Sequence, residues 1–327
     1  MTSSTWTEPV LQGELLQPSV PAIPYRRLRF KHVTVALLLS LIFVIAFAFL
    51  ALHGYIAWVL SNPTVATITS NPYMAKRLQY ETVAFPALDH STNLDGWYIP
   101  AANSKKTIVF SHGYGANREE LWVPMYDLAQ FAHRLNYNVV MFDYGFASTT
   151  HKLAATGGAI ESQQLLGAVD YAKQRGAKEV VVWGFSMGAG TALQAALKTD
   201  DINAMILDST FLLEPDTLYH NISQHIQLPR DVSLPILRSL FPVINGTSLK
   251  QIPYEEVKQH DYKMPIFFIH GTNDEKAPYP IAEHLASNQS NAASEVWISN
   301  GSLHEMIYRQ HSKEYLKRTA AFLNEAL

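Results

Sequence analysis

Eight short runs of β-forming residues alternate with longer stretches of helical periodicity from residue 78 to the end of the chain. In the helical stretches, apolar residues recur every three or four positions, as they do on the buried face of a helix. Strands that alternate with helices pair in parallel, because each connecting helix returns the chain to the same end of the sheet. The sequence therefore predicts an α/β fold with a mostly parallel sheet and helices on both faces. The strand candidates are LQYETVAF, GWYIP, TIVFS, NVVMFDY, EVVVWGF, AMILD, PIFFIH and EVWIS.

Three of the helical stretches have a well-defined apolar face. We expect helices over residues 118–135, 159–175 and 313–327. The expected core-facing residues are Leu121, Met125, Leu128, Ala132 and Leu135 in the first helix, and Leu316, Ala320, Leu323 and Leu327 in the last.

A long segment interrupts the alternation between the sixth and seventh strand candidates. A crossover needs about a dozen residues, whereas this connection extends over residues 211–264 and contains several prolines. Long insertions of this kind are often lids. We therefore predict a helical cap over the functional edge of the sheet, with a purely decorative insertion as the alternative.

The most apolar run of the chain lies near its start, over residues 33–52, and carries no charge. A helix of about 20 residues spans about 30 Å, the thickness of a bilayer core. Cations precede the run and the next charge after it is Lys76, which predicts a cytoplasmic N-terminus and an extracytoplasmic domain. The alternative is a signal peptide cleaved after Ala46-Phe47-Ala48. The cations are Arg26, Arg27, Arg29 and Lys31.

These features divide the chain into four parts. We expect a cytoplasmic tail over residues 1–32, a transmembrane signal anchor over 33–60, a tether over 61–77 and the α/β domain over 78–327. The net charge of -3 with 16% charged residues offers no basic field, so nucleic acid is not an expected partner. The absence of cysteine excludes disulfides, thiolate catalysis and cysteine-metal sites.

Ser186 lies in Gly184-Phe185-Ser186-Met187-Gly188, between a strand candidate and a helical stretch at 189–197. This G-x-S-x-G spacing is typical of a nucleophile elbow, in which neighbours without side chains let a strained serine backbone fit. Isolated matches are common in glycine-serine turns, but the strand before it and the helix after it favour catalysis. We therefore expect Ser186 to be a nucleophile.

A serine hydroxyl needs a base and a group that orients the base. His304 lies in the loop after the last strand candidate, and Asp274 lies in the loop after the one before it. The order serine, aspartate, histidine is the order expected for a triad on this kind of sheet. Asp208, at the end of the sixth strand candidate, is the alternative acid, and its structural role would be to cap the following segment.

The loop His112-Gly113-Tyr114-Gly115 follows the third strand candidate. It can direct the Tyr114 backbone N–H toward the site, and the Met187 N–H can supply the second oxyanion donor. We expect His112 to hold this loop. His304-Glu305 lacks the second histidine of H-E-x-x-H, and the glycine-rich phosphate-binding motifs are absent, so we expect no metal and no cofactor.

Six motifs resemble, in this order, those of the serine hydrolases of the α/β-hydrolase superfamily: GWYIPA, VFSHGYGANREE, FDYG, GFSMGAG, IHGTNDEKAPY and GSLHEMIY. The chain is similar to membrane-anchored bacterial hydrolases described as serine aminopeptidase-like or acylglycerol-lipase-like. The resemblance covers residues 78–327 and implies an eight-stranded sheet. It also implies the triad Ser186, Asp274 and His304, with Tyr114 and Met187 as oxyanion donors.

One departure from this family concerns the fourth strand candidate. Asp143 is followed by Tyr144-Gly145, where many relatives have an arginine and a glycine. This difference leaves open which groups brace the oxyanion loop.

The sequence thus predicts a membrane-anchored serine hydrolase that cleaves a carboxylic ester, or a thioester or amide, through an acyl-enzyme. The apolar cap favours a hydrophobic small-molecule or lipid-like acyl substrate. The alternatives are a peptidase or acyltransferase with the same triad, or a non-catalytic surface-binding protein that retains the fold. Because no strand candidate or triad residue lies before residue 61, we expect residues 1–60 to be dispensable for activity.

Overall fold

The computed structural model describes residues 1–5, 30–120 and 122–327. Most of the expected tail over residues 1–32, including Arg26, Arg27 and Arg29, lies outside the described residues, and so does Leu121. The chain forms two compact units, Met1–Ala48 and Phe49–Leu327.

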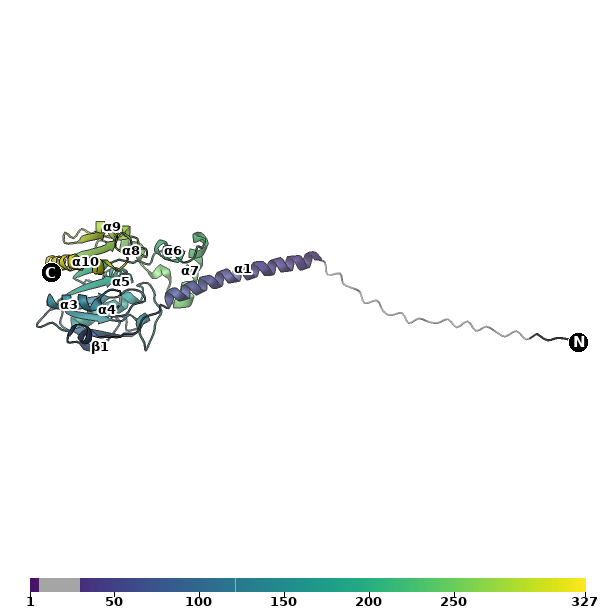
Figure 1. Cartoon of the computed structure of the whole chain (residues 1–327), viewed down its shortest axis with the longest axis horizontal. Coiled ribbons are helices and arrows are strands. Elements are labelled where there is room, and N and C mark those ends of the chain that lie inside the picture. Colours follow the sequence, from purple (N-terminus) through teal and green to yellow (C-terminus); the bar gives the residue numbers. More distant parts are fainter. Residues whose placement is uncertain (6–29, 121) are drawn as a thin grey trace. The chain divides into compact units, whose positions relative to one another are not determined.

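Helix α1 (Phe30–Ser61) begins in the first unit and ends in the second (Figure 1). Its most apolar window has a mean hydropathy of 3.1, so the helix is long and apolar enough to cross a membrane. A single helix of this kind near the N-terminus is compatible with a membrane anchor and equally with a signal sequence.

An eight-stranded sheet forms the centre of the second unit, in the order β1-β2-β4-β3-β5-β6-β7-β8. The β1–β2 and β2–β4 pairs are antiparallel, and all other pairs are parallel. Each strand coincides with one of the eight predicted runs, so the predicted fold class is confirmed. The strands are β1 (Glu81–Pro86), β2 (Asn93–Ile99), β3 (Lys106–Ser111), β4 (Asn138–Phe142), β5 (Glu179–Phe185), β6 (Ala204–Asp208), β7 (Ile266–Gly271) and β8 (Glu295–Ser299).

Helices surround the sheet, and most of them follow the strands as the alternating pattern predicted. They are α2 (Pro72–Lys76), α3 (Met125–Arg134), α4 (Glu161–Gln174), α5 (Met187–Ala196), α6 (Pro215–Ser223), α7 (Arg230–Asn245), α8 (Tyr254–Gln259), α9 (Pro280–Ser287) and α10 (Ile307–Ala326), with short 3-10 turns at Gly145–Ala147 and Leu249–Gln251.

Two helix predictions need correction. The helix expected over 118–135 begins only at Met125, because Pro124 disfavours helical backbone at the residue before it. In α10, the fully buried side chains include Tyr315 and Phe322, whereas Leu316 and Ala320 are only half-buried. The large aromatic rings take the positions against the sheet, since Tyr315 stacks on Trp183 of β5 at 6.1 Å between ring centroids.

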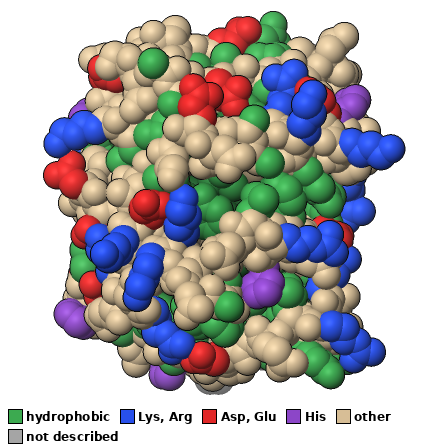
Figure 2. Space-filling model, turned by 90° about the vertical axis from the view of Figure 1, so that its left-hand side faces the viewer, with side chains coloured by type: hydrophobic (Ala, Val, Ile, Leu, Met, Phe, Trp, Pro, Cys, Tyr) green, Lys and Arg blue, Asp and Glu red, His purple; other side chains and the backbone are tan. Residues whose placement is uncertain are grey.

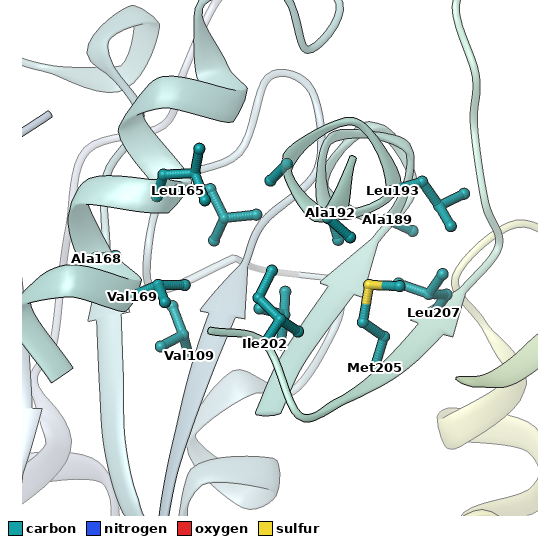
Figure 3. Close-up of a cluster of buried hydrophobic side chains, with 14 of the residues drawn as sticks. Val109, Leu165, Ala168, Val169, Ala189, Ala192, Leu193, Ile202, Met205 and Leu207 are labelled. Atoms are coloured by element: carbon teal, nitrogen blue, oxygen red, sulfur yellow. The ribbon is translucent and has the colours of Figure 1, made fainter. Parts of the chain in front are cut away.

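The core covers both faces of the sheet. Val180 and Val182 of β5 belong to one buried cluster, while Val181 and Trp183 belong to the other, because successive residues of a strand point to opposite faces. Burial on both faces makes β5 a rigid support for the turn that follows it. Figure 3 shows part of the first cluster, in which Leu165, Ala168 and Val169 of α4 and Ala189, Ala192 and Leu193 of α5 lie near Val109, Met205 and Leu207 of the strands.

The segment between β6 and β7 contains α6, α7 and α8. Apolar side chains of α6 and α7 pack in a third cluster, separate from the two clusters on the sheet. The last turns of α1 join this cluster through the buried Ala57. The cluster therefore links the insertion to a part of the chain that precedes the whole sheet. Its buried members also include Leu218, Ile222, Leu228, Leu234, Leu237 and Phe241.

The segment between α1 and β1 lies against the second unit. The Thr69 backbone N–H donates to Glu119 at 2.6 Å, and Asn117 donates to the Ala66 carbonyl at 2.7 Å. Residues 61–77, expected as a tether, are thus hydrogen-bonded to the loop that follows β3.

Figure 2 shows one face of the molecule, on which Lys and Arg side chains are interspersed with Asp and Glu around apolar residues. This face presents no extended basic field of the kind that attracts a polyanion.

Candidate active site

Ser186 lies at the turn between β5 and α5, with φ 50° and ψ -118°. This left-handed backbone is strained for a residue with a side chain. The two flanking glycines make the turn possible: a Cβ at Gly188 would lie 2.0 Å from the Ser111 carbonyl oxygen, and one at Gly184 would lie 2.7 Å from Ala189 Cα. The local sequence thus folds as the G-x-S-x-G pattern predicted.

Three of the predicted site residues form one chain of hydrogen bonds. His304 Nε2 lies 2.8 Å from Ser186 Oγ, and His304 Nδ1 lies 2.6 Å from Asp274 Oδ2. The other carboxylate oxygen of Asp274 accepts the backbone N–H groups of Lys276 at 2.9 Å and Ala277 at 2.8 Å. The loops after β5, β7 and β8 bring these side chains together at one edge of the sheet.

The surroundings of Asp274 and His304 keep the Asp274 carboxylate charged. Burial raises the pKa of Asp274, but hydrogen bonds from His270 and His304 outweigh burial and hold this pKa well below the ordinary value. Burial lowers the pKa of His304, whereas the bond to Asp274 and the nearby Glu305 carboxyl raise it, and the net pKa lies above the ordinary value. A neutral His304 would therefore accept a proton readily.

Asp208, the alternative acid, has other partners. Its carboxylate accepts the Tyr315 hydroxyl at 2.9 Å and the Ser209 hydroxyl at 2.9 Å. Burial raises the pKa of Asp208 to about 6, although both of these hydrogen bonds oppose the rise. The expected capping role is wrong, because this carboxylate anchors helix α10 to the end of β6.

The loop after β3, which carries Tyr114, passes beside Ser186. A Cβ at Gly113 would lie 3.4 Å from Ser186 Cβ, which is van der Waals contact distance. Met187 directly follows Ser186 as the first residue of α5. The two predicted oxyanion donors therefore come from segments that adjoin the serine.

His112 and Tyr144 brace the loop that carries Tyr114 through hydrogen bonds. His112 Nδ1 donates to the Gly113 carbonyl at 2.9 Å, and His112 Nε2 accepts the Tyr144 backbone N–H at 3.1 Å. Burial lowers the pKa of His112 to about 4, which keeps the ring neutral with the proton on Nδ1. The Tyr144 hydroxyl adds a bond to Ser111 at 2.6 Å.

Asp143, directly after β4, also braces this region. Its carboxylate accepts the Arg118 backbone N–H at 2.7 Å and lies 3.5 Å from the Arg118 guanidinium. Burial raises the pKa of Asp143 to about 6, against the opposing effect of Arg118.

Two buried carboxyl groups near Ser186 were missed by the sequence interpretation. A Cβ at Gly113 would lie 2.9 Å from Glu305 Oε1 and 3.2 Å from Glu120 Oε1, so both acids approach the same point. The Trp122 indole donates to Glu305. Burial raises the pKa of both carboxyls, and repulsion by Glu305 raises that of Glu120 further.

The signals for these acids were weak. Glu120 lay within an expected amphipathic helix, where an acid normally faces solvent. Glu305 was considered only as half of a metal motif. Within residues 1–5, 30–120 and 122–327, the structure contains no group of three His, Cys, Asp or Glu side chains arranged to hold a metal ion.

A cavity of about 430 Å³ opens beside Ser186 and His304. Most of its wall is apolar, and part of that wall is the end of α1. The segment expected to be dispensable for activity, residues 1–60, thus includes four residues of the cavity wall at its end, and its dispensability stays a prediction. The lining residues include Tyr55, Ile56, Val59, Leu60, Tyr114, Trp122, Phe211, Leu213, Leu218, Ile222, Phe241, Lys276 and Glu305.

Comparisons with known proteins agree with this architecture. A family model described as the alpha/beta hydrolase fold matches residues 106–232. The uncharacterized protein YfhR of Salmonella typhimurium is 24% identical over 266 residues, which cover 76% of this chain and 82% of YfhR. Protein bem46 of Schizosaccharomyces pombe is 24% identical over 62% of this chain and 63% of bem46.

Solved structures show the same arrangement of strands and helices. The Pyrococcus furiosus esterase Pf2001 superposes with a TM-score of 0.65 and 23% identity, covering 81% of this chain and 99% of that one. Est1E from Butyrivibrio proteoclasticus, solved with ferulic acid bound, gives a TM-score of 0.57 and 17% identity over 75% of this chain and 99% of Est1E. Together with the sheet order and the matched family model, these likenesses identify the chain as a protein of the α/β-hydrolase fold.

Proposed function

We propose that this protein is a serine hydrolase that cleaves a carboxylic ester. The observation that carries the proposal is the continuous hydrogen-bonded chain from Ser186 through His304 to Asp274, placed at the wall of an apolar cavity. A buried serine in strained backbone, bonded to a histidine that is itself oriented by a carboxylate, is the arrangement that activates a hydroxyl for acyl transfer.

In this mechanism, Ser186 Oγ attacks the ester carbonyl while His304 Nε2 accepts the hydroxyl proton. Asp274 holds the Nδ1–H of His304 and stabilises the imidazolium that forms. The negative oxygen of the tetrahedral intermediate accepts the backbone N–H groups of Tyr114 and Met187. His304 then protonates the leaving alcohol, and water, activated by the same histidine, releases the acid from the acyl-enzyme.

The cavity supports an ester with a hydrophobic acyl group rather than a peptide. Apolar side chains provide most of the lining, and they cannot pair with the backbone N–H and C=O groups of a peptide. The name of the Pyrococcus furiosus structure, an esterase, is in keeping with this choice.

A fluorophosphonate probe tests the proposal directly, because such probes label only activated serines. We expect labelling of the full-length protein at Ser186, identified by peptide mass spectrometry. The labelling rate should rise with pH through a midpoint above 6.5, the ordinary pKa of histidine, because the raised pKa keeps His304 protonated and unable to act as a base below that point.

Hydrolysis of nitrophenyl esters under the same conditions separates the remaining alternatives. Absence of labelling together with absence of ester hydrolysis would favour a non-catalytic protein. Labelling with cleavage of peptides but not of esters would make the protein a peptidase, and a labelling rate that is flat from pH 5 to 8 would exclude a histidine base.

We further propose that α1 anchors the protein in the cell membrane with its N-terminus in the cytoplasm and the hydrolase domain outside. The proposal depends on the cations at residues 26–31 and on the absence of any charge between residues 33 and 75. Protease added to intact cells should digest the domain and leave the N-terminal tail intact. Protection of the domain until lysis would invert the orientation, and a mature N-terminus at Phe49 would make the helix a signal peptide.

A further inference from the structure

The last turns of α1 form one side of the cavity beside Ser186. Tyr55, Ile56, Val59 and Leu60 all line it, together with residues of α6 and α7. Every lining residue belongs to the unit Phe49–Leu327, so the cavity is contained within one compact body. The end of α1 is therefore structurally part of the candidate active site.

Specific hydrogen bonds hold this helix end against the site. The Tyr114 hydroxyl donates to the Val59 carbonyl at 3.1 Å, and the Ala155 backbone N–H donates to the Ser61 carbonyl at 2.7 Å. Ala57 is fully buried among side chains of α6 and α7. Because Tyr114 also belongs to the loop beside Ser186, the helix end and the reacting centre are directly connected.

The same helix end adjoins the most apolar part of the chain. The most apolar run, over residues 33–52, ends three residues before Tyr55. Three residues span at most about 11 Å even when fully extended. The cavity wall therefore lies within about 11 Å of the end of this most apolar run, and the wall residues belong to the segment expected as the membrane anchor.

We propose that the cavity binds the acyl chain of a membrane lipid ester, and that residues 55–60 of α1 form the chain-binding wall. This inference depends on the proposed ester hydrolysis and adds the substrate class to it. A single helix would anchor the enzyme in the lipid layer and contribute the surface along which the acyl chain enters. Both the apolar lining and its position beside Ser186 are required for this role, because the chain must leave its carbonyl at the serine hydroxyl.

The selectivity of the full-length protein for acyl chains of different length tests whether residues 55–60 form the chain-binding wall. For nitrophenyl esters from acetate to laurate, kcat/KM should rise about fourfold for each methylene until the cavity is filled. Val59→Trp should reduce the laurate-to-acetate ratio of kcat/KM at least tenfold, because the indole occupies space needed by the chain. Val59 lines the cavity and is 40% exposed, so a larger side chain takes up cavity space and does not overpack the core.

Leu50→Trp is the matched control. Leu50 lies on the same helix, is 48% exposed and does not line the cavity, so the ratio should remain at the wild-type value. An unchanged ratio in Val59→Trp, or an equal fall in both variants, would overturn the assignment of the wall. Failure of the wild-type protein to hydrolyse any ester, including acetate, would instead contradict the proposed function.

The membrane as source of the substrate is tested with nitrophenyl palmitate embedded in phosphatidylcholine vesicles. We expect rapid hydrolysis when the full-length protein and the ester share the same vesicles, and at least tenfold slower hydrolysis when they are in separate vesicle populations. Equal rates in the two arrangements would show that the ester reaches the cavity through water, and would overturn the membrane route.

Discussion

Replacement of Ser186 by alanine should lower kcat for ester hydrolysis by roughly 10⁶-fold. The substitution removes the nucleophile but little else: Ser186 is 7% exposed, and deletion of one hydroxyl creates no large cavity. The backbone strain at φ 50° is the same for alanine as for serine, so the melting temperature should stay within about 2 °C of wild type. Steady-state kinetics and thermal denaturation of the two proteins provide the measurement.

His304→Ala should cause a loss of similar size, because the nucleophile and its base act as one unit. For the same reason, the double variant should be no less active than either single variant. Multiplicative losses in the double variant would show that the two residues act independently, and retention of most of the wild-type kcat in Ser186→Ala would reject the mechanism.

Asp274→Asn should reduce kcat by about 10⁴-fold, because an amide can no longer fix the Nδ1–H form of His304 or stabilise the imidazolium. The short contact between His304 Nδ1 and Asp274 Oδ2, 2.6 Å, is the interaction that the substitution alters. Asp208→Asn should cost at most about tenfold in kcat, since it perturbs hydrogen bonds to Tyr315 and Ser209 but none to His304.

The two aspartate variants form a matched comparison. Both carboxyl groups are buried, and they lie at or just after the ends of two adjacent strands, Asp208 at the end of β6 and Asp274 after β7. Kinetics on one ester at one pH should be measured beside the melting temperature of each variant. If Asp208→Asn proved the more damaging to kcat at equal stability, the orienting acid would be Asp208 and the remainder of the proposed site would stand.

The sequence by itself determined the positions of the strands and the turn that carries Ser186. These features depend on local patterns: a buried strand needs a continuous apolar run, and the strained turn at Ser186 needs glycine at 184 and 188. The chain order of Ser186, Asp274 and His304 was also readable, because the loops at the carboxyl edge of a parallel sheet can be assigned once the strands are known. The helix starting at Met125 was less predictable, since Pro124 competes with an apolar periodicity that continues through it.

Only the tertiary structure decided which groups meet. Asp208 and Asp274 both follow strands, and the choice between them as partner of His304 depends on side-chain direction across more than one loop. The approach of Glu120 to Glu305 and the contribution of Val59 to the cavity wall join residues far apart in the chain. Such contacts follow from how helices and loops pack together, which local periodicity does not encode, because periodicity reports that a face is buried but not what buries it.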